Sequence, residues 1–163
     1  MLPRPHVGHC NTQARPAHLT GLGIVTGAVL FVQLLFGALV AGLNAGLVTD
    51  QWPLMNGRFF PGPTVAGRGF LDALFNDPAI VHFVHRWWAW VAVAALIILA
   101  RAARPLDRRA SVAIHIAFGT QILLGIATVM SGMNIPLAAL HQLTGALLVI
   151  ATAWGAHTIG RRG

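Results

Sequence analysis

The chain of 163 residues contains no glutamate, no lysine and no tyrosine, and its four acidic residues are all aspartates. Charged residues make up only 9% of the chain, whereas about a quarter of the residues in a soluble globular domain are charged. Hydrophobic residues make up 56%, and the mean hydropathy is +0.69. This scarcity of charge excludes an ordinary soluble domain and indicates an integral membrane protein.

The sequence also has little that would build a polar enzyme site. Its one cysteine, Cys10, allows no internal disulfide. No carboxylate or cysteine lies within an apolar run, which argues against zinc and di-iron sites that need such ligands beside histidine. Neither a glycine-rich phosphate loop nor a Ser/His/Asp arrangement stands out.

The sequence does have four apolar runs, each long enough to cross a bilayer as a helix of about 20 residues. We therefore expect an all-α membrane four-helix bundle over residues 20–160. The tail before it, residues 1–19, has no apolar core; we expect it to be disordered and not to be a cleaved signal peptide. The expected spans are 20–43, 79–101, 110–131 and 137–159, with an outer loop at 44–78.

The net charge of +7 comes from arginines that flank the apolar runs, which is typical of topogenic charge rather than of a nucleic-acid surface. Most of them lie on the side of the two termini, whereas the opposite side has two arginines offset by three aspartates. We therefore expect cytoplasmic termini. The arginines on the terminal side are Arg4, Arg15, Arg101, Arg104, Arg108, Arg109, Arg161 and Arg162.

Histidines interrupt two of the apolar runs at similar depths. At 1.5 Å per residue, His85 lies roughly 9 Å and His141 roughly 6 Å below the outer ends of their helices. Arg86 follows His85 directly, and an unpaired cation in lipid costs on the order of 3 kcal/mol on insertion scales. Two histidines at one depth, beside an arginine, indicate a shared role.

The two halves of the chain also resemble each other. "VQLLFGALVAG" aligns with "TQILLGIATVMSG", and "VHRWW" aligns with "LHQLT". The alignment pairs Gln33 with Gln121 and His85 with His141, and it predicts two parallel helical hairpins related by an axis along the membrane normal. Such an axis would bring the two histidines to face each other, with small residues such as Gly37 and Gly125 permitting close helix approach.

Two neutral imidazoles that face each other across a four-helix bundle suit the two axial positions of a haem iron. Arg86 would then meet the haem propionates near the outer surface. The alternative for each histidine is a hydrogen bond between helices. His82 lies on the same helix face as His85 and has three possible roles: binding a propionate, transferring protons, or lying in water at the interface.

Three further features have less specific interpretations. The segment "GFLDALF" in the outer loop predicts a short amphipathic helix on the membrane surface, placed as a lid over the site. Trp87, Trp88 and Trp90 are expected to form an outer aromatic belt. His115 and His157, near the inner ends of the last two spans, are expected to be interfacial, with a second haem as the alternative.

Three stretches carry a family resemblance: "FGALVAGLNAGLVTDQWPLMNGRFFP", "NDPAIVHFVHR" and "TQILLGIATVMSGMNIPLAALHQLTGA". In this order and spacing they resemble the C-terminal half of haem A synthases, over about residues 27–150. Members of that family are typically eight-helix proteins made of two four-helix halves. The resemblance implies a haem b held by His85 and His141 in a multi-pass protein of the bacterial inner membrane, near the outer face. It also implies oxidation of a haem o methyl group to the formyl group of haem a, for cytochrome oxidase assembly.

The chain departs from the family pattern in its length and in its residues. It lacks the N-terminal half, in which haem o binds and a glutamate lies three residues before a histidine. The matching position here is His82, a weak catalytic candidate. The expected partners are membrane lipid and haem, and no nucleic acid. Three interpretations stay open. They are a half-size synthase working as a homodimer or beside a separate N-terminal half or haem o-producing enzyme, a non-catalytic b-type cytochrome for electron transfer, and an inactive remnant.

Overall fold

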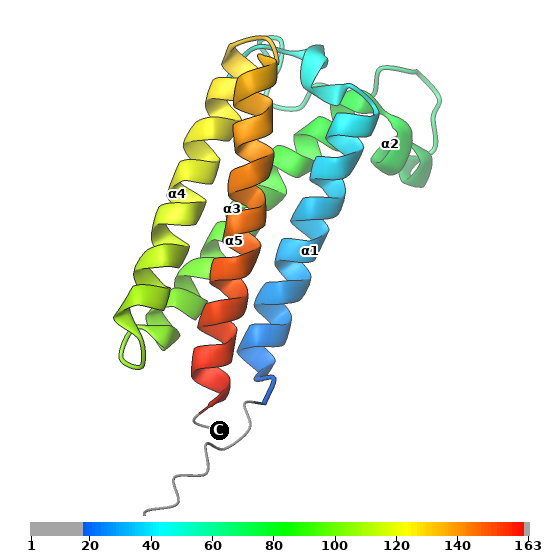
Figure 1. Ribbon diagram of the computed structural model, residues 1–163. Helices are drawn as coiled ribbons and strands as arrows, with labels where there is room; N and C mark the ends of the chain where they lie inside the picture. Colours follow the sequence, from blue (N-terminus) through cyan, green and yellow to red (C-terminus); the bar gives the residue numbers. More distant parts are fainter. Residues whose placement is uncertain (1–17, 162–163) are drawn as a thin grey trace, which may run out of the picture.

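The computed structural model describes residues 18–161, and within them the regular structure is helical (Figure 1). Four of the helices are long and apolar enough to cross a membrane, which confirms the expected all-α four-helix bundle. The predicted tail lies almost wholly outside the described residues. The helices are α1 (Gly21–Gly42), the 3-10 turn η1 (Ala45–Val48), α2 (Phe70–Asn76), α3 (Pro78–Ala103), α4 (Arg108–Met130) and α5 (Ile135–Gly160).

Side-chain caps fix where the long helices begin. The Asp77 carboxylate accepts the backbone N–H groups of Ala79 and Ile80 at the start of α3, and the Asn134 amide oxygen accepts that of Leu137 in α5. Proline follows each cap within two residues, because a first-turn residue needs no N–H. As a result, α3 and α5 begin one and two residues before the predicted positions 79 and 137.

Helices α3 and α5 pack against each other and against both other long helices. α1 and α4 both pack against α3 and α5, while α1 and α4 lie diagonally opposite each other. The described chain ends and the α3–α4 turn lie at one end of the bundle, which we call the terminal end (Figure 1). The segment 43–69 and the turn 131–134 lie at the other, which we call the loop end (Figure 1).

The hydrophobic core fills the terminal half of the bundle. Gly155 of α5 lets two helices approach closely there, since a methyl group on it would come within 2.7 Å of Ile114 of α4 and 3.7 Å of Leu99 of α3. The three helices are therefore closely packed at that level. The buried core residues are Leu30, Leu96, Leu99, Ala100, Ile114, Leu148 and Ala151.

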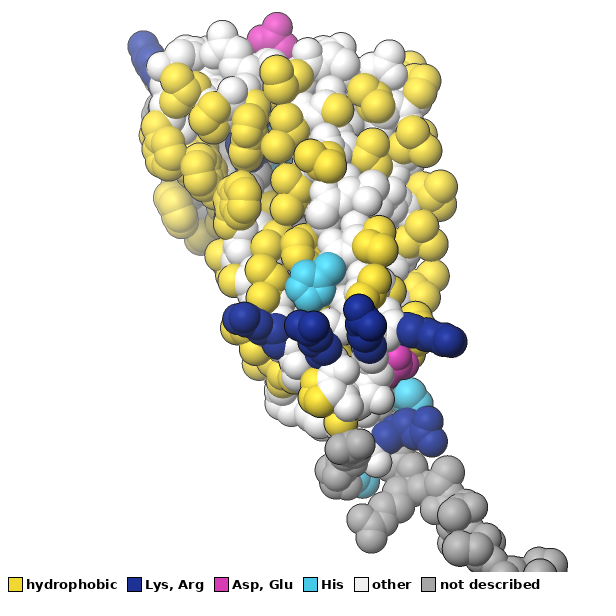
Figure 2. Space-filling view, turned by 90° about the vertical axis from the view of Figure 1, so that its left-hand side faces the viewer, with side chains coloured by type: hydrophobic (Ala, Val, Ile, Leu, Met, Phe, Trp, Pro, Cys, Tyr) yellow, Lys and Arg dark blue, Asp and Glu magenta, His cyan; other side chains and the backbone are white. Residues whose placement is uncertain are grey.

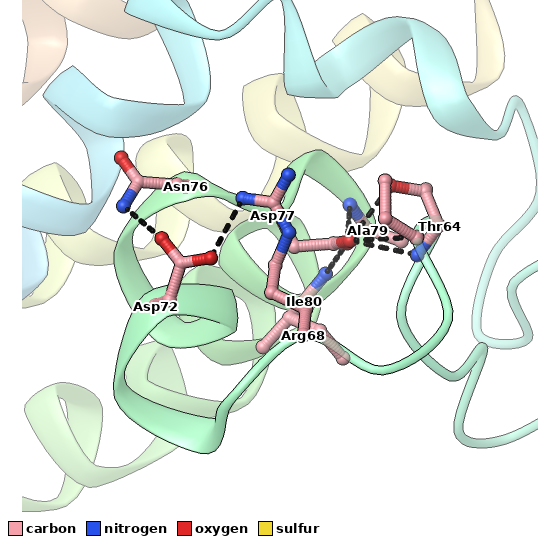
Figure 3. A network of polar contacts seen from close by, with 8 residues as sticks. Thr64, Arg68, Asp72, Asn76, Asp77, Ala79 and Ile80 are labelled. Atoms are coloured by element: carbon pink, nitrogen blue, oxygen red, sulfur yellow. Dashed lines mark hydrogen bonds and ion pairs between the residues drawn. The ribbon is translucent and has the colours of Figure 1, made fainter.

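The predicted amphipathic helix forms as α2 at the loop end, where the Phe75 ring stacks on Phe36 of α1 at 6.4 Å between centroids. A polar network joins this region to α3 (Figure 3). The buried Asp77 carboxylate accepts the Thr64 N–H and hydroxyl, each at 2.7 Å. Asp72 of α2 pairs with Arg68 at 3.3 Å. The loop that precedes α2 is thereby fixed to the first turn of α3.

Charge is distributed unevenly along the bundle. Figure 2 shows arginine side chains gathered toward the terminal end, below a surface on which hydrophobic side chains predominate. The arginines of the α3–α4 turn are exposed, and among the described residues Arg68 with Asp72 is the one ion pair. Arginines without acidic partners beside an apolar surface are typical of a membrane boundary.

Candidate functional site

A cavity of about 510 Å³ lies between the four long helices in the loop-end half of the bundle. Its volume falls within the range of about 300–1,000 Å³ that small-molecule and cofactor sites occupy. Its wall is mostly apolar, and no carboxylate is among its lining residues. The polar and aromatic side chains that line it are Gln33, Trp52, His82, His85, Arg86, Trp90, Phe118, Gln121, Thr128, His141 and Gln142.

His85 enters this cavity from α3 and is held by α1. The Gln33 amide nitrogen lies 3.2 Å from the His85 Nδ1 and also donates to the His85 carbonyl oxygen at 3.2 Å. A methyl group on Gly37, one turn further along α1, would come within 3.1 Å of the ring carbon Cε1. No described residue hydrogen-bonds to the other ring nitrogen, Nε2. Gln33 therefore orients the ring, and the missing side chain at Gly37 makes room for it.

His141 enters the same cavity from α5 and is held by the aligned residues of α4, with the glutamine beside the other ring nitrogen. The Gln121 amide nitrogen lies 3.3 Å from the His141 Nε2. A methyl group on Gly125, one turn further along α4, would come within 3.0 Å of the ring carbon Cε1. The other ring nitrogen, Nδ1, is buried and has no hydrogen-bond partner. The residues that the sequence alignment pairs thus make matching contacts in the two hairpins.

Arg86 also lines the cavity, but its guanidinium is directed to the segment at the loop end. Its Nη1 donates to the carbonyl oxygens of Gln51, Pro53 and Leu54 at 3.1–3.3 Å. The guanidinium carbon lies 5.1 Å from the centre of the Trp52 ring. The side chain is 6% exposed. Arg86 therefore binds the backbone that covers the cavity, a role that the sequence analysis did not anticipate.

His82 lies one turn before Arg86 and is 3% exposed. Its Nε2 accepts an N–H from Arg86 Nη2 at 3.3 Å, which requires the imidazole to be neutral, with its proton on Nδ1. Because the side chain is buried, His82 is not the water-exposed interfacial residue that was one of its predicted alternatives. It lines the cavity together with His85.

The other two histidines of interest lie away from the cavity. His115 and His157 are both exposed and are not among its lining residues. The His115 Nδ1 donates to the Ser111 carbonyl oxygen at 2.8 Å, within its own helix. Within residues 18–161, no group of three or more histidine, cysteine or acidic side chains lies close enough together to hold a metal ion.

The loop end covers the cavity through residues to which the sequence analysis gave no role. The Met133 side chain, at a backbone φ of +66°, packs directly against Gly46 of η1. A side chain at residue 46 would collide with the Met133 sulfur. Both residues line the cavity, so the two loop-end segments meet across its outer side. No local sequence signal predicts this contact, since the two residues are far apart in the chain.

This arrangement fits a cofactor that needs two imidazole ligands. Each histidine has one ring nitrogen beside a glutamine amide and one without a hydrogen bond. A flat apolar group would face mostly hydrocarbon in this cavity. Second-sphere hydrogen bonds of this kind fix the tautomer and orientation of a histidine ligand. The observation that supports the fit is the repeated set of glutamine, glycine and histidine.

The chain is similar to proteins of one family. Residues 2–153 match the family model COX15-CtaA, described as cytochrome oxidase assembly protein. The chain is 59% identical over 147 residues to a haem A synthase of Erythrobacter litoralis, covering 90% of this chain and 43% of that protein. It is 52% identical over 150 residues to a haem A synthase of Sphingopyxis alaskensis, covering 91% and 42%. A haem A synthase of Novosphingobium aromaticivorans is 48% identical over 153 residues, covering 90% and 44%.

The chain thus spans less than half the length of these curated relatives. No solved structure matches it.

Proposed function

We propose that this chain, which belongs to the haem A synthase (COX15-CtaA) family of cytochrome oxidase assembly proteins, takes part in haem A biosynthesis by binding a haem b through His85 and His141. The observation that carries the proposal is the matched pair of imidazoles in one cavity, each beside a glutamine amide and a glycine. If the two histidines served only to form hydrogen bonds between helices, that role would not explain why each ring also has a nitrogen without a partner.

A haem b bound by two histidines would supply an iron that takes up and gives back one electron. The chain's own residues would do the rest. Gln33 and Gln121 would orient the rings, and the apolar wall would exclude water. The hydrophobic core in the terminal half closes the cavity on the side of the terminal end. Arg86 holds the covering segment 51–54 and keeps a positive charge at the loop end, where carboxylates of a porphyrin would lie.

The activity that the family name implies, oxidation of a haem o methyl group to a formyl group, needs a site for haem o as well. Within this chain the proposal assigns no residue to that site beyond His82 as a weak candidate. Its neutral ring borders the cavity and contacts Arg86. A second copy of the chain, a separate N-terminal half or a haem o-producing enzyme would be the partner for this chemistry.

A second candidate function, a b-type cytochrome module for electron transfer, is favoured by one observation. The cavity is lined by three imidazoles and by no carboxylate, whereas proton transfer during an oxidation is commonly assisted by an acidic or basic side chain, and His82 is the one imidazole that the proposal leaves unassigned to the iron. In this alternative the chain passes electrons to or from a partner and does not itself bind haem o.

For orientation we propose that the terminal end faces the cytoplasm of a bacterium and that the cavity lies near the outer face of its inner membrane. The exposed arginines of the α3–α4 turn support this placement by the positive-inside rule. The exposed apolar side chains of α2, among them Phe70 and Leu71, support a position of α2 at the outer membrane surface.

The test is to purify the chain from membranes of a host that makes haem o, record its absorption spectrum and identify the extracted haems by chromatography and mass. We expect haem b with a low-spin spectrum, lost in both His85→Ala and His141→Ala. Haem o or haem a beside it would favour the synthase over the electron-transfer module. An unaltered low-spin spectrum in either variant, or no haem in the unmodified protein, would overturn the proposal.

A further inference from the structure

We infer that Gln121, with Gln33 as its counterpart, is a positioning residue whose amide oxygen accepts the ring N–H of an iron-bound imidazole and thereby sets the reduction potential of the haem. This inference rests on the proposed function, because it concerns the same cavity. The two glutamines contact neither chain end nor loop; each reaches across to a histidine of the neighbouring helix.

The first observation is that the amide oxygens of both glutamines lack a hydrogen-bond partner. The Gln33 Oε1 and the Gln121 Oε1 are buried and have no hydrogen-bond partner in the described chain. A buried acceptor without a partner costs about 1–3 kcal/mol, so a native fold rarely keeps one without a functional reason. Here two such oxygens occur at aligned positions, each on the side chain that touches a histidine.

The second observation concerns the protons of the rings. As the structure stands, the amide N–H of Gln121 points to the His141 Nε2, so the ring proton belongs on Nδ1. An imidazole that binds iron through one nitrogen carries its proton on the other, and that N–H then needs an acceptor. A half-turn of the Gln121 amide, with the ring presenting its free nitrogen to the iron, supplies this acceptor from an oxygen that previously had no partner.

The third observation is that the Gln121 amide lies close to α5. A methyl group on Gly145, one turn after His141 in α5, would come within 3.3 Å of the Gln121 Nε2. The absence of a side chain at residue 145 therefore leaves room for the amide beside the ring. A neutral acceptor at this place would raise the basicity of the ligand and favour ferric iron without adding a charge to the cavity.

The two glutamines are not equal, and this makes the inference more specific. Gln33 also donates to the His85 carbonyl oxygen at 3.2 Å, and a half-turn of its amide would break that bond. Gln121 has no such second bond and is free to turn. We therefore expect changes at Gln121 to shift the reduction potential more than the same changes at Gln33.

The experiment is a redox titration of the purified, haem-loaded protein and of the variants Gln121→Leu, Gln121→Glu and Gln33→Leu. Thr120→Val serves as the matched control, because Thr120 neighbours Gln121 on α4, is exposed and does not line the cavity. Electron paramagnetic resonance of the ferric form reports the axial ligand field independently.

We expect the midpoint potential to rise in Gln121→Leu, which removes the acceptor, and to fall in Gln121→Glu, which provides a stronger one. Gln33→Leu should give a smaller rise, and Thr120→Val no change. A merely structural role would shift both Gln121 variants in the same direction, and that result, or unchanged potentials with haem bound, would overturn the inference alone. Absence of haem from the unmodified protein would instead overturn the proposed function, and this inference with it.

Discussion

Gly125 and His141 lie so close that a methyl group on the glycine would come within 3.0 Å of the imidazole Cε1. The same relationship joins Gly37 to His85, at 3.1 Å. Contacts of this length force a neighbour to move, and here the neighbour is a ring that the proposal assigns to the iron. The two glycines, which line the cavity, would therefore be part of the proposed cofactor site although they carry no side chain.

We predict that Gly125→Ala and Gly37→Ala each weaken haem binding by about 10- to 100-fold, the range found for changes in the second shell of metal sites. The reason is displacement of a ligand ring, since alanine itself favours a helix over glycine by about 1 kcal/mol. Haem content and affinity, measured by titration of the haem-free protein, check this prediction.

The matched controls are Gly119→Ala in α4 and Gly27→Ala in α1, where an added methyl group would meet nothing within 4 Å. Both should keep full haem content and unfold at the same temperature as the unmodified protein, or at a slightly higher one. Equal loss of haem in a control and its partner would show that the effect comes from the helix and not from the ring.

Arg86→Leu is predicted to release the segment 51–54 from the cavity. The guanidinium makes three hydrogen bonds to carbonyl oxygens of that segment, and hydrogen bonds to charged groups contribute about 1.5–3 kcal/mol each. Hydrogen exchange of backbone amides in the segment should accelerate, and limited proteolysis should cut there. Arg58→Leu, a change at an exposed arginine of the same loop, should leave both measurements unaltered; protection that persists in Arg86→Leu would contradict the assignment.

Asp77 is predicted to make folding stability depend on acid pH. Burial alone would raise the pKa of Asp77, but hydrogen bonds from the Thr64 hydroxyl and from the backbone N–H groups of Ile80, Thr64 and Val65 outweigh it, so that the pKa lies below its ordinary value of 3.8. A group whose pKa is lower in the folded state stabilises the fold above the unfolded value of 3.8. That contribution is lost as the pH falls through the folded value.

Thermal unfolding in detergent tests this. Asp77→Ala should lower the stability at neutral pH by about 0.5–2 kcal/mol, as expected for loss of a helix cap. The difference from the unmodified protein should shrink once the pH falls below about 4. Asp72→Ala is the comparison, because Asp72 is exposed and pairs only with Arg68 and Asn76 of the same region. A difference that does not change with pH would rule out the carboxylate as its cause.

His115→Ala and His157→Ala are predicted to leave the haem spectrum unchanged. Both side chains are exposed, and neither lines the cavity. The pair also serves as a histidine-to-alanine control for the His85 and His141 variants. Haem content per protein is the deciding measurement, because a halved content in either variant would revive the second haem that the sequence left open as an alternative.

Much of the fold could be predicted from local patterns. The four apolar runs predicted the four long helices, and each predicted boundary lies within three residues of the observed one. The prediction succeeds because a bilayer-crossing segment must satisfy its own backbone hydrogen bonds. The helical spacing of apolar residues in "GFLDALF" predicted α2. The alignment of the two halves predicted which histidines face one cavity, and the structure places both in its wall.

The contacts that give the cavity its chemistry could not be predicted in this way. The contacts of the Arg86 guanidinium with three carbonyl oxygens and with His82 were not predicted, and the expected contact with propionates stays a prediction. The roles of Gln33 and Gln121 also went unassigned, although the alignment had paired them. A glutamine in an apolar run shows only that some polar group is near; which atom it reaches depends on the rotation of two helices against each other.

By itself, then, the sequence determined the helices, their order and the positions of His85 and His141 along them, because hydropathy and a rise of 1.5 Å per residue fix these along one dimension. The tertiary structure decided where the cavity lies. Helices α3, α4 and α5 pack closely around Gly155 in the terminal half, and the bundle leaves space toward the loop end, where Gly37 and Gly125 admit the two rings. Packing between helices is a three-dimensional match of side-chain volumes, and no pattern along a single helix contains it.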